Sequence, residues 1–170
     1  MKQLKPIQFD TSKVSPTEKF TSVEMAKLWA TYMGNSLSNH ILRHFLQHVE
    51  NEDIKTLLEN AFGLTEKFMS KIKGFMEKEN FPVPQGYTED DFNSAAPRLF
   101  EDEFYVHYLK YAAKAGLSIY AIALPLVMRL DIREFFIQCG MATTELLAQI
   151  NGILMDKGFI IKPPVLPTPD

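Results

Sequence analysis

Residues Thr21 to Glu50 read TSVEMAKLWATYMGNSLSNHILRHFLQHVE, and this stretch decides the fold. Its two ends have the apolar spacing of a helix that packs in a bundle, with Leu28 near the start and Leu46 near the end. Its middle is polar instead, and holds Asn35, Ser36, Ser38, Asn39, His40 and Arg43. The functional question is whether this polar middle is a site or a solvated face.

The start of this helix has strong local signals. Thr21 and Glu24 have the spacing of a capping box, in which each side chain accepts a hydrogen bond from the backbone of the other residue. Phe20 and Met25 occupy the two positions of a hydrophobic staple. We therefore expect the first helix to begin at about Thr21.

A second helix is predicted from about Glu52 to Glu79, after a break at Asn51. Its apolar stripe follows the three-four spacing of one helix face. The stripe consists of Ile54, Leu57, Leu58, Ala61, Thr65, Phe68, Ile72 and Phe75.

The connection that follows, from Asn80 to about Phe100, contains Pro82, Pro84 and Pro97. Because proline disfavours helix at its own and the preceding position, this segment is expected to be extended, with at most one short turn at 88–91. It is long enough to cross a bundle from one end to the other.

Two more helices are predicted. The third begins near Glu101 and ends or kinks at Pro125, because proline lacks the backbone donor that a helix needs. The fourth runs from Asp131, as its cap, to about Lys157, with Gly158 suited to the left-handed position after a helix. Small residues of the third helix should let a neighbouring helix come near: Ala112, Ala113, Ala115 and Gly116.

These elements predict an all-α fold, a ferritin-like four-helix bundle with a long crossover between helices two and three. Residues 1–20 are expected to form an extended N-terminal arm, residues 21–158 the bundle, and residues 159–170 a proline-rich C-terminal tail.

Composition excludes several classes of function. The 170 residues carry a net charge of −3 without a basic stripe, so no nucleic-acid partner is expected. No apolar run has the length of a membrane span or a signal peptide, so we expect synthesis in the cytoplasm. The single cysteine, Cys139, excludes an internal disulfide and is expected to be a buried structural thiol.

A ferritin-like bundle raises the possibility of a di-iron centre, which needs Glu-x-x-His on two helices. The residues three before the four histidines are Leu37, Ile41, Phe45 and Phe104. No Glu-x-x-His motif exists, so we expect no di-iron site and no cofactor. The usual nucleophile and nucleotide-binding motifs are also absent, and the chain is not expected to be an enzyme.

His40, His44 and His48 recur at intervals of four. Residues four apart share a helix face, so His40 and His44 could hold a metal ion with a third ligand. Each step of four turns the direction by about 40°, however, so all three cannot meet at one ion. The simpler interpretation is a solvated face with one partly buried histidine.

Asn35, Asn39 and Arg43 lie nearer the core side of the first helix. Buried polar groups need partners, and residues at similar depth on the other helices include Thr65, Glu66, His107, Tyr108, Tyr111, Thr143, Thr144 and Glu145. One interpretation is a polar layer that fixes helix register. The other is a small-ligand site formed by Asn39, His40, Arg43, Tyr111 and Glu145, with Arg43 holding an anion.

Several short stretches resemble a family of ferritin-like proteins from spore-forming bacteria, labelled spore coat proteins and loosely similar to the coat-F proteins. The stretches are KLWATYM at 27–33, FPVPQGYT at 81–88, APRLF at 96–100, DIREFF at 131–136 and GFIIKPP at 158–164. The resemblance implies a bundle associated with the spore coat, and no metal or catalytic residue carries over from it. Family members commonly hold two copies of the unit, so this single copy is expected to form a homodimer and to contact other coat proteins.

The first functional hypothesis is thus a non-enzymatic structural or interaction protein, associated with the spore coat and lacking a di-iron site. The alternative is a binding module that holds a small ligand or a metal in the polar layer of the bundle.

Overall fold

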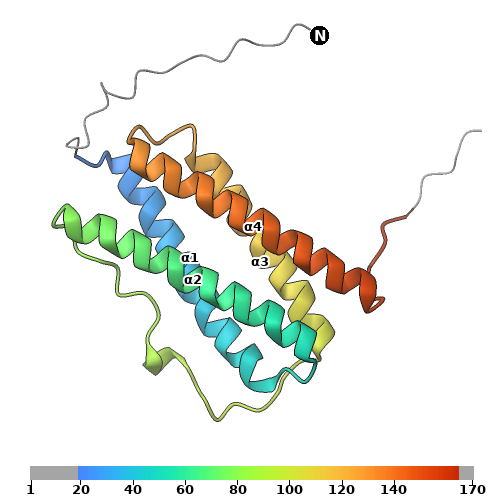
Figure 1. The fold of residues 1–170 in the computed structure, drawn as a ribbon. Coiled ribbons are helices and arrows are strands. Elements are labelled where there is room, and N and C mark those ends of the chain that lie inside the picture. The colour runs from blue at the N-terminus through green and yellow to red at the C-terminus, as the bar shows by residue number, and fades with distance from the viewer. Residues whose placement is uncertain (1–18, 165–170) are drawn as a thin grey trace, which may run out of the picture.

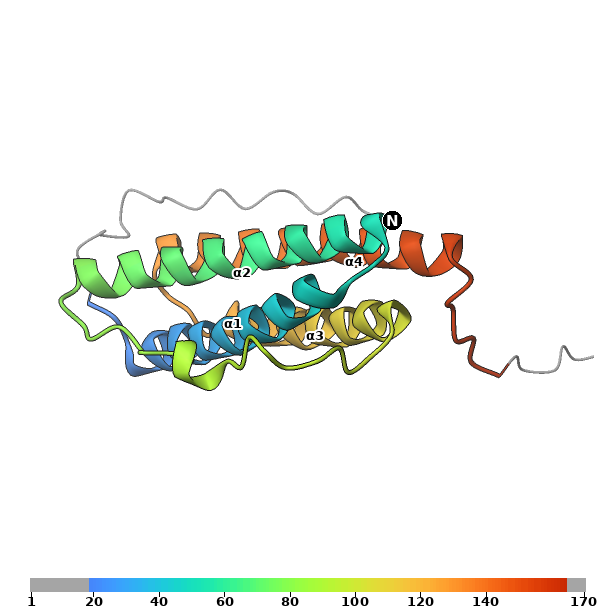
Figure 2. The same cartoon turned by 90° about the horizontal axis from the view of Figure 1, so that it is seen from below.

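The computed structural model describes residues 19–164, which form four long α-helices and no β-strand. They are α1 (Ser22–His48), α2 (Glu52–Lys78), α3 (Asp102–Ala123) and α4 (Leu130–Asp156), with one short 3-10 helix, η2 (Glu89–Asp91), before α3. The helices lie in two layers, α1 beside α3 in one and α2 beside α4 in the other (Figure 1 and Figure 2). The predicted all-helical fold with four helices is therefore confirmed.

Local capping signals set the helix ends as predicted. The Thr21 hydroxyl accepts a hydrogen bond from the Glu24 backbone, and the Glu24 carboxylate accepts one from the Thr21 backbone at 2.8 Å. At the end of α4, Gly158 has a φ of +72°, and the Phe159 N–H donates to the Leu154 carbonyl at 2.9 Å. These three bonds and the φ of Gly158 confirm the capping box and the left-handed glycine at opposite ends of the helical region.

The start of α4 differs from the prediction by two residues. Arg129, not Asp131, is the residue that precedes the helix. The fully buried carboxylate of Glu24, from α1, accepts hydrogen bonds from the backbone N–H groups of Met128 and Arg129 at 2.8 Å. Because a distant helix supplies this carboxylate, Asp131 is left to pair with the Arg129 guanidinium.

The same end of the bundle is held by a buried ion pair. The Arg129 side chain is 4 % exposed, pairs with Glu79 at the end of α2 at 2.6 Å, and stacks over the ring of Phe20. Burial would raise the pKa of Glu24, but hydrogen bonds from Arg129, Thr21 and Met128 lower it below its usual value. These contacts join α1, α2 and the α3–α4 loop at one end.

The core consists of two apolar clusters, one in each half of the bundle. Leu28, Phe68 and Phe136 belong to the cluster near the α1 start, and Leu42 and Leu58 to the other. Between them lies a layer of buried polar side chains: Thr31, Asn35, Asn39, Thr65 and Thr143. The polar middle of α1 thus divides the core.

Residues 79–101, the α2–α3 connection, run along the outer side of α1 (Figure 2). η2 is the one short turn expected near Thr88. The last described residues, 159–164, are not helical, as expected for the tail, whereas the predicted N-terminal arm lies outside the described residues except for its last two. In the described part of the chain, no helix has the length and apolar character needed to cross a membrane.

Candidate functional site

The polar middle of α1 has two faces with different surroundings. The core face consists of Thr31, Asn35 and Asn39 and points into the bundle. The connection face consists of Ser36, His40, Arg43 and His48, and each of these side chains contacts the α2–α3 connection. The residues predicted to form one site are therefore divided between two environments.

Asn39 joins α1 to α2. Its side-chain amide donates to the Thr65 hydroxyl at 2.9 Å, and that hydroxyl donates to the Phe62 carbonyl at 2.7 Å. Because a one-turn slip of either helix would break this bond, Asn39 and Thr65 fix the register of the two helices. This geometry favours the register-setting layer over a ligand site at Asn39.

His40 is engaged by backbone on both sides. Its Nδ1 lies 3.0 Å from the Ser36 carbonyl oxygen, and its Nε2 lies 3.0 Å from the Thr88 carbonyl oxygen in the connection. The rings of Tyr87 and Phe92 pack around it. The Nε2 contact joins His40 to the connection and the Nδ1 contact lies within α1, so both ring nitrogens face backbone oxygens rather than an open ligand site.

The guanidinium of Arg43 is already paired with a carboxylate of this chain. Its guanidinium donates to both carboxylate oxygens of Glu89, at 2.6 and 2.9 Å, and lies 4.4 Å from the centre of the Phe92 ring. The hydrogen bonds from Arg43 lower the pKa of Glu89. The predicted anion-binding side chain is thus occupied by a residue of the connection.

His48, the last histidine of the row, also contacts the connection, and His44 packs beside His48. His48 Nε2 lies 3.0 Å from the Ala96 carbonyl oxygen, and the His44 and His48 rings are 4.6 Å apart. Burial, with a smaller contribution from His48, lowers the pKa of His44. His44 Nε2 is buried without a hydrogen-bond partner among residues 19–164, whereas both His40 ring nitrogens face backbone oxygens, so the two histidines have different surroundings. Within residues 19–164, no three His, Cys, Asp or Glu side chains gather as a potential metal site.

Tyr111 and Glu145 are not near the polar layer. Tyr111 is 74 % exposed on the outer side of α3, and Glu145 is exposed on α4 beside Met141. The reason is helical rotation: the inward positions are taken by Tyr108, three residues earlier, and by Thr143, two residues before Glu145. The structure therefore does not bring Asn39, His40, Arg43, Tyr111 and Glu145 together.

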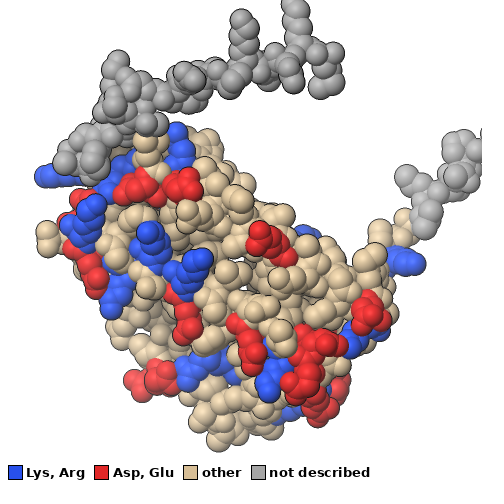
Figure 3. All heavy atoms as spheres, viewed as in Figure 1, with Lys and Arg blue, Asp and Glu red and all other residues tan. Residues whose placement is uncertain are grey.

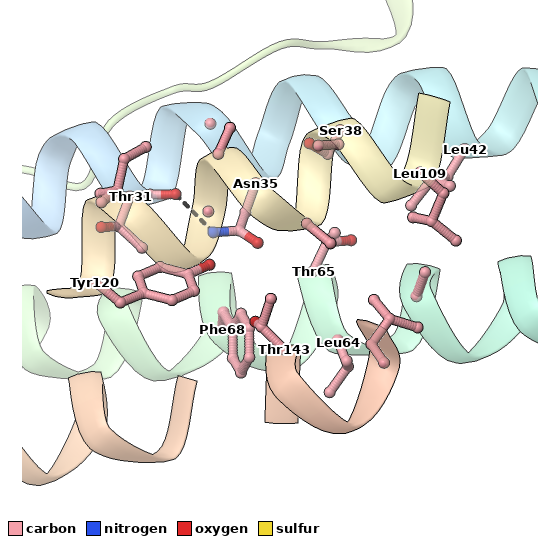
Figure 4. Close-up of a pocket in the computed structure, with 18 of the residues that line it drawn as sticks. Thr31, Asn35, Ser38, Leu42, Leu64, Thr65, Phe68, Leu109, Tyr120 and Thr143 are labelled. Carbon is pink, nitrogen blue, oxygen red and sulfur yellow. Dashed lines mark hydrogen bonds between the residues drawn. The ribbon is translucent and has the colours of Figure 1, made fainter. Parts of the chain in front are cut away.

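The structure instead has a pocket of about 250 Å³ between α1 and α3, which reaches α2 and α4 (Figure 4). Small residues leave the space: Ala30 and Gly34 from α1, and Ala112, Ala113, Ala115 and Gly116 from α3. The sequence predicts that the small residues of α3 let a neighbouring helix come near. On the side that faces α1, these residues line a cavity between the two helices.

The pocket has a polar end and an apolar end. Figure 4 shows Thr31, Asn35 and Tyr120 together at one end and Leu42 and Leu109 at the other. The Asn35 amide donates to the Thr31 carbonyl at 2.7 Å. The Thr31 Oγ1 atom is buried and has no hydrogen-bond partner among the residues that the structure describes.

Burial raises the pKa of Tyr120 to about 12, so its hydroxyl is a neutral hydrogen-bond donor at pH 7. Sequence reasoning assigned Tyr120 to an apolar stripe and did not single out Thr31. The available signal was the coincidence of Thr31 and Asn35, one turn apart, with Gly34 on the first helix and the small residues of the third.

An apolar groove of about 460 Å³ lies on the outer side of α3 and α4. Leu117, Ala121 and Leu124 form one wall, and Ile137, Gly140 and Met141 form the other. Glu145 is the one acidic or basic side chain that lines it. Figure 3 shows few charged side chains over the middle of α4.

The comparisons with known proteins match this architecture. A model of a family described as a protein of unknown function, DUF3231, matches residues 8–170. A "putative spore coat protein" from Bacillus halodurans C-125 is similar in structure, with a TM-score of 0.79, 20% identity, and coverage of 89% of this chain and 98% of the other.

Two further solved structures share the fold. A DUF305 fragment from Deinococcus radiodurans has a TM-score of 0.69 at 8% identity, covering 82% of this chain and 99% of that one. A conserved hypothetical protein from Mycobacterium tuberculosis has a TM-score of 0.67 at 9% identity, covering 80% and 100%. At these identities the similarity shows the fold alone. No curated protein matches the chain.

Proposed function

Because the chain belongs to the DUF3231 family, whose function is unknown, we propose a role from its geometry: a non-enzymatic structural or interaction protein that self-associates in the spore coat. It is made in the cytoplasm and has a ferritin-like bundle, with the α2–α3 connection as the crossover and without a di-iron site. Similarity to the Bacillus halodurans protein supports the coat association. Other coat proteins are its further partners.

The observation that carries this proposal is the apolar groove on α3 and α4. Met141 is 61 % exposed and Ile137 is 38 % exposed, and the α3–α4 loop adds Leu126 and Met128, both exposed. Contiguous apolar surface of this kind is typical of protein interfaces. Methionine side chains adapt readily to a partner surface. A second copy related by a two-fold axis would cover the groove with the same residues.

The absence of catalysis is supported by how the reactive side chains are used. Three of the four histidines lie on α1, where His40 and His48 hold the connection. Cys139 is fully buried, and burial raises the pKa of its thiol to about 12. A thiol in that state is a poor nucleophile at neutral pH.

Multi-angle light scattering after size exclusion tests the self-association. The parent chain at about 50 µM, far above the Kd of a stable homodimer, should elute as a dimer. Met141→Arg, which places a charge in the groove, should elute as a monomer. Met155→Arg is the matched control, because Met155 is similarly exposed on α4 but does not line the groove. A monomeric parent, or a dimeric Met141→Arg variant, would contradict the proposal.

The coat association has a separate test. Mass spectrometry of washed spore coats from the organism that carries this gene should detect the chain in the coat fraction. Its recovery only from the soluble mother-cell fraction would contradict the assignment.

A further inference from the structure

The pocket between α1 and α3 is open to solvent through a mouth of small or apolar side chains. Ala30 and Gly34 border the mouth on α1, and Ala115 and Ile119 border it on α3, all of them exposed. A Cβ atom added to Gly34 would meet no other atom within 4 Å. A ligand can therefore enter between the two helices without unfolding either of them.

The residues that line the pocket determine whether a bound ligand can carry a charge. The twenty lining residues include no Asp, Glu, Lys, Arg or His, and most of them are Ala, Gly, Leu, Ile, Phe or Tyr. A charged ligand would lose its hydration without gaining a counter-ion, which is a large free-energy cost. The pocket therefore favours an uncharged ligand with a mainly apolar body.

The polar end determines where such a ligand places a polar group. Thr31 is 2 % exposed, and its hydroxyl oxygen has no partner in the described part of the chain. An unpartnered buried hydroxyl is costly, and a ligand group that bonds to it removes that cost. The Asn35 amide and the Tyr120 hydroxyl lie at the same end (Figure 4).

We propose that this pocket is a binding site for a small uncharged ligand with an apolar body and one hydroxyl or carbonyl group, which bonds to Thr31 at the polar end. Buried apolar cavities of roughly 150 Å³ bind benzene, so about 250 Å³ suits a ligand of about 8 to 12 non-hydrogen atoms. Alkylphenols have this size and polarity. The site shares only Tyr120 with the α3–α4 groove and does not depend on self-association.

Isothermal titration calorimetry with 4-propylphenol tests the site. The parent chain should bind one molecule with a Kd below about 1 mM, an affinity reasonable for ten heavy atoms. Propylbenzene, which lacks the hydroxyl, should bind about 5- to 10-fold more weakly, and 4-propylbenzoate at pH 7 should not bind. Absence of saturable 4-propylphenol binding, or equal binding of the benzoate, would overturn the proposal.

Two variants locate the site. Gly34→Leu fills the mouth and should weaken 4-propylphenol binding at least 10-fold, whereas Gly63→Leu, at an exposed helical glycine outside the pocket, should leave it unchanged. Ala115→Leu closes the mouth from α3 and replaces Gly34→Leu if that variant fails to fold by circular dichroism. Unchanged binding to a folded mouth variant would overturn the assignment.

Thr31→Val tests the polar end. It should weaken 4-propylphenol binding about 5- to 10-fold and leave propylbenzene binding unchanged, because only the phenol bonds to the hydroxyl. An equal effect on both ligands, or none on either, would show that Thr31 does not make the proposed bond. Met141→Arg should bind 4-propylphenol like the parent whatever its oligomeric state.

Discussion

The two faces of the polar middle of α1 carry similar side chains, but they differ in whether those side chains have hydrogen-bond partners. On the connection face, the Ser36 hydroxyl accepts the Tyr87 N–H at 2.8 Å, and His40 and Arg43 also have partners in the α2–α3 connection. On the core face, the Thr31 hydroxyl has no partner among the described residues and lies beside a pocket. One face of the helix is fully used by the fold, and the other retains unused hydrogen-bonding capacity.

This difference indicates which polar side chains in a bundle of this kind are candidates for a function. Polar side chains that contact backbone of their own chain are explained by that contact. A buried polar group without a partner, next to a cavity, is not explained by the fold alone. The histidines and Arg43 attract attention in the sequence, but the geometry moves the functional question to the less conspicuous Thr31.

The largest expected effect comes from a substitution that adds an atom between the connection and α1. Gly86 has a φ of +70°, and a Cβ atom there would lie 2.6 Å from Ser36 Oγ. Gly86→Ala should therefore lower the free energy of unfolding by about 2 to 4 kcal/mol, through backbone strain and loss of the Ser36–Tyr87 bond. Urea denaturation followed by circular dichroism measures this.

Gly158→Ala is the control for that measurement. Gly158 has a similar φ of +72° but open space around it. Its cost should be only about 1 kcal/mol, from the backbone conformation alone. Equal costs at the two glycines would show that the connection does not press on α1 at Gly86.

A second test removes one hydroxyl from each face. Ser36→Ala leaves the Tyr87 N–H without its acceptor and should cost about 1 to 2 kcal/mol. Thr31→Val removes a hydroxyl that bonds to nothing in residues 19–164, so it should cost nothing or stabilise by up to about 1 kcal/mol. Chemical denaturation of both variants at one pH gives the comparison, and a larger loss for Thr31→Val would reverse the roles of the two faces.

A smaller effect is expected at the solvent side of the connection face. Glu89→Gln removes the charge that Arg43 binds, yet Glu89 is largely exposed. We expect the Tm to fall by no more than about 2 °C in low salt, because exposed ion pairs contribute little. The difference from the parent should shrink further in 0.5 M NaCl, and a salt-independent loss would indicate that the pair acts through packing instead.

The smallest expected effect is the pH dependence from His44. Burial lowers the pKa of His44 in the folded state, so the unfolded chain binds a proton more readily. Stability should therefore be lost as the pH falls from about 7.5 through the unfolded histidine value near 6.5. The free energy of unfolding of His44→Gln should fall less between pH 7.5 and 5.5, and identical slopes in parent and variant would contradict this origin.

Local signals made most of the fold predictable. The capping box at Thr21 and the glycine at 158 act within a few residues, so the sequence specifies the helix ends there directly. The start of α4 is different, because the carboxylate that receives its backbone donors comes from Glu24, more than a hundred residues earlier. No local pattern contains that information.

The candidate site was less predictable for a related reason. Spacing places Asn39 and His40 on adjacent parts of α1, but it does not say which side the connection covers, since an extended segment has no period to align. Small residues such as Ala112 and Gly116 are equally compatible with close helix packing and with a cavity. Only the relative placement of α1 and α3 distinguishes the two outcomes.

The contacts of the α1 histidines also show how much longer the connection is than the distance it spans. His40 meets Thr88 and His48 meets Ala96, both 48 residues apart in sequence, so eight connection residues advance only as far as two turns of helix. That distance is about 12 Å, whereas eight extended residues could reach about 26 Å. The connection therefore has about twice the contour length it needs here. We expect that it would accept a deletion of several residues around η2, provided the two histidine contacts were kept.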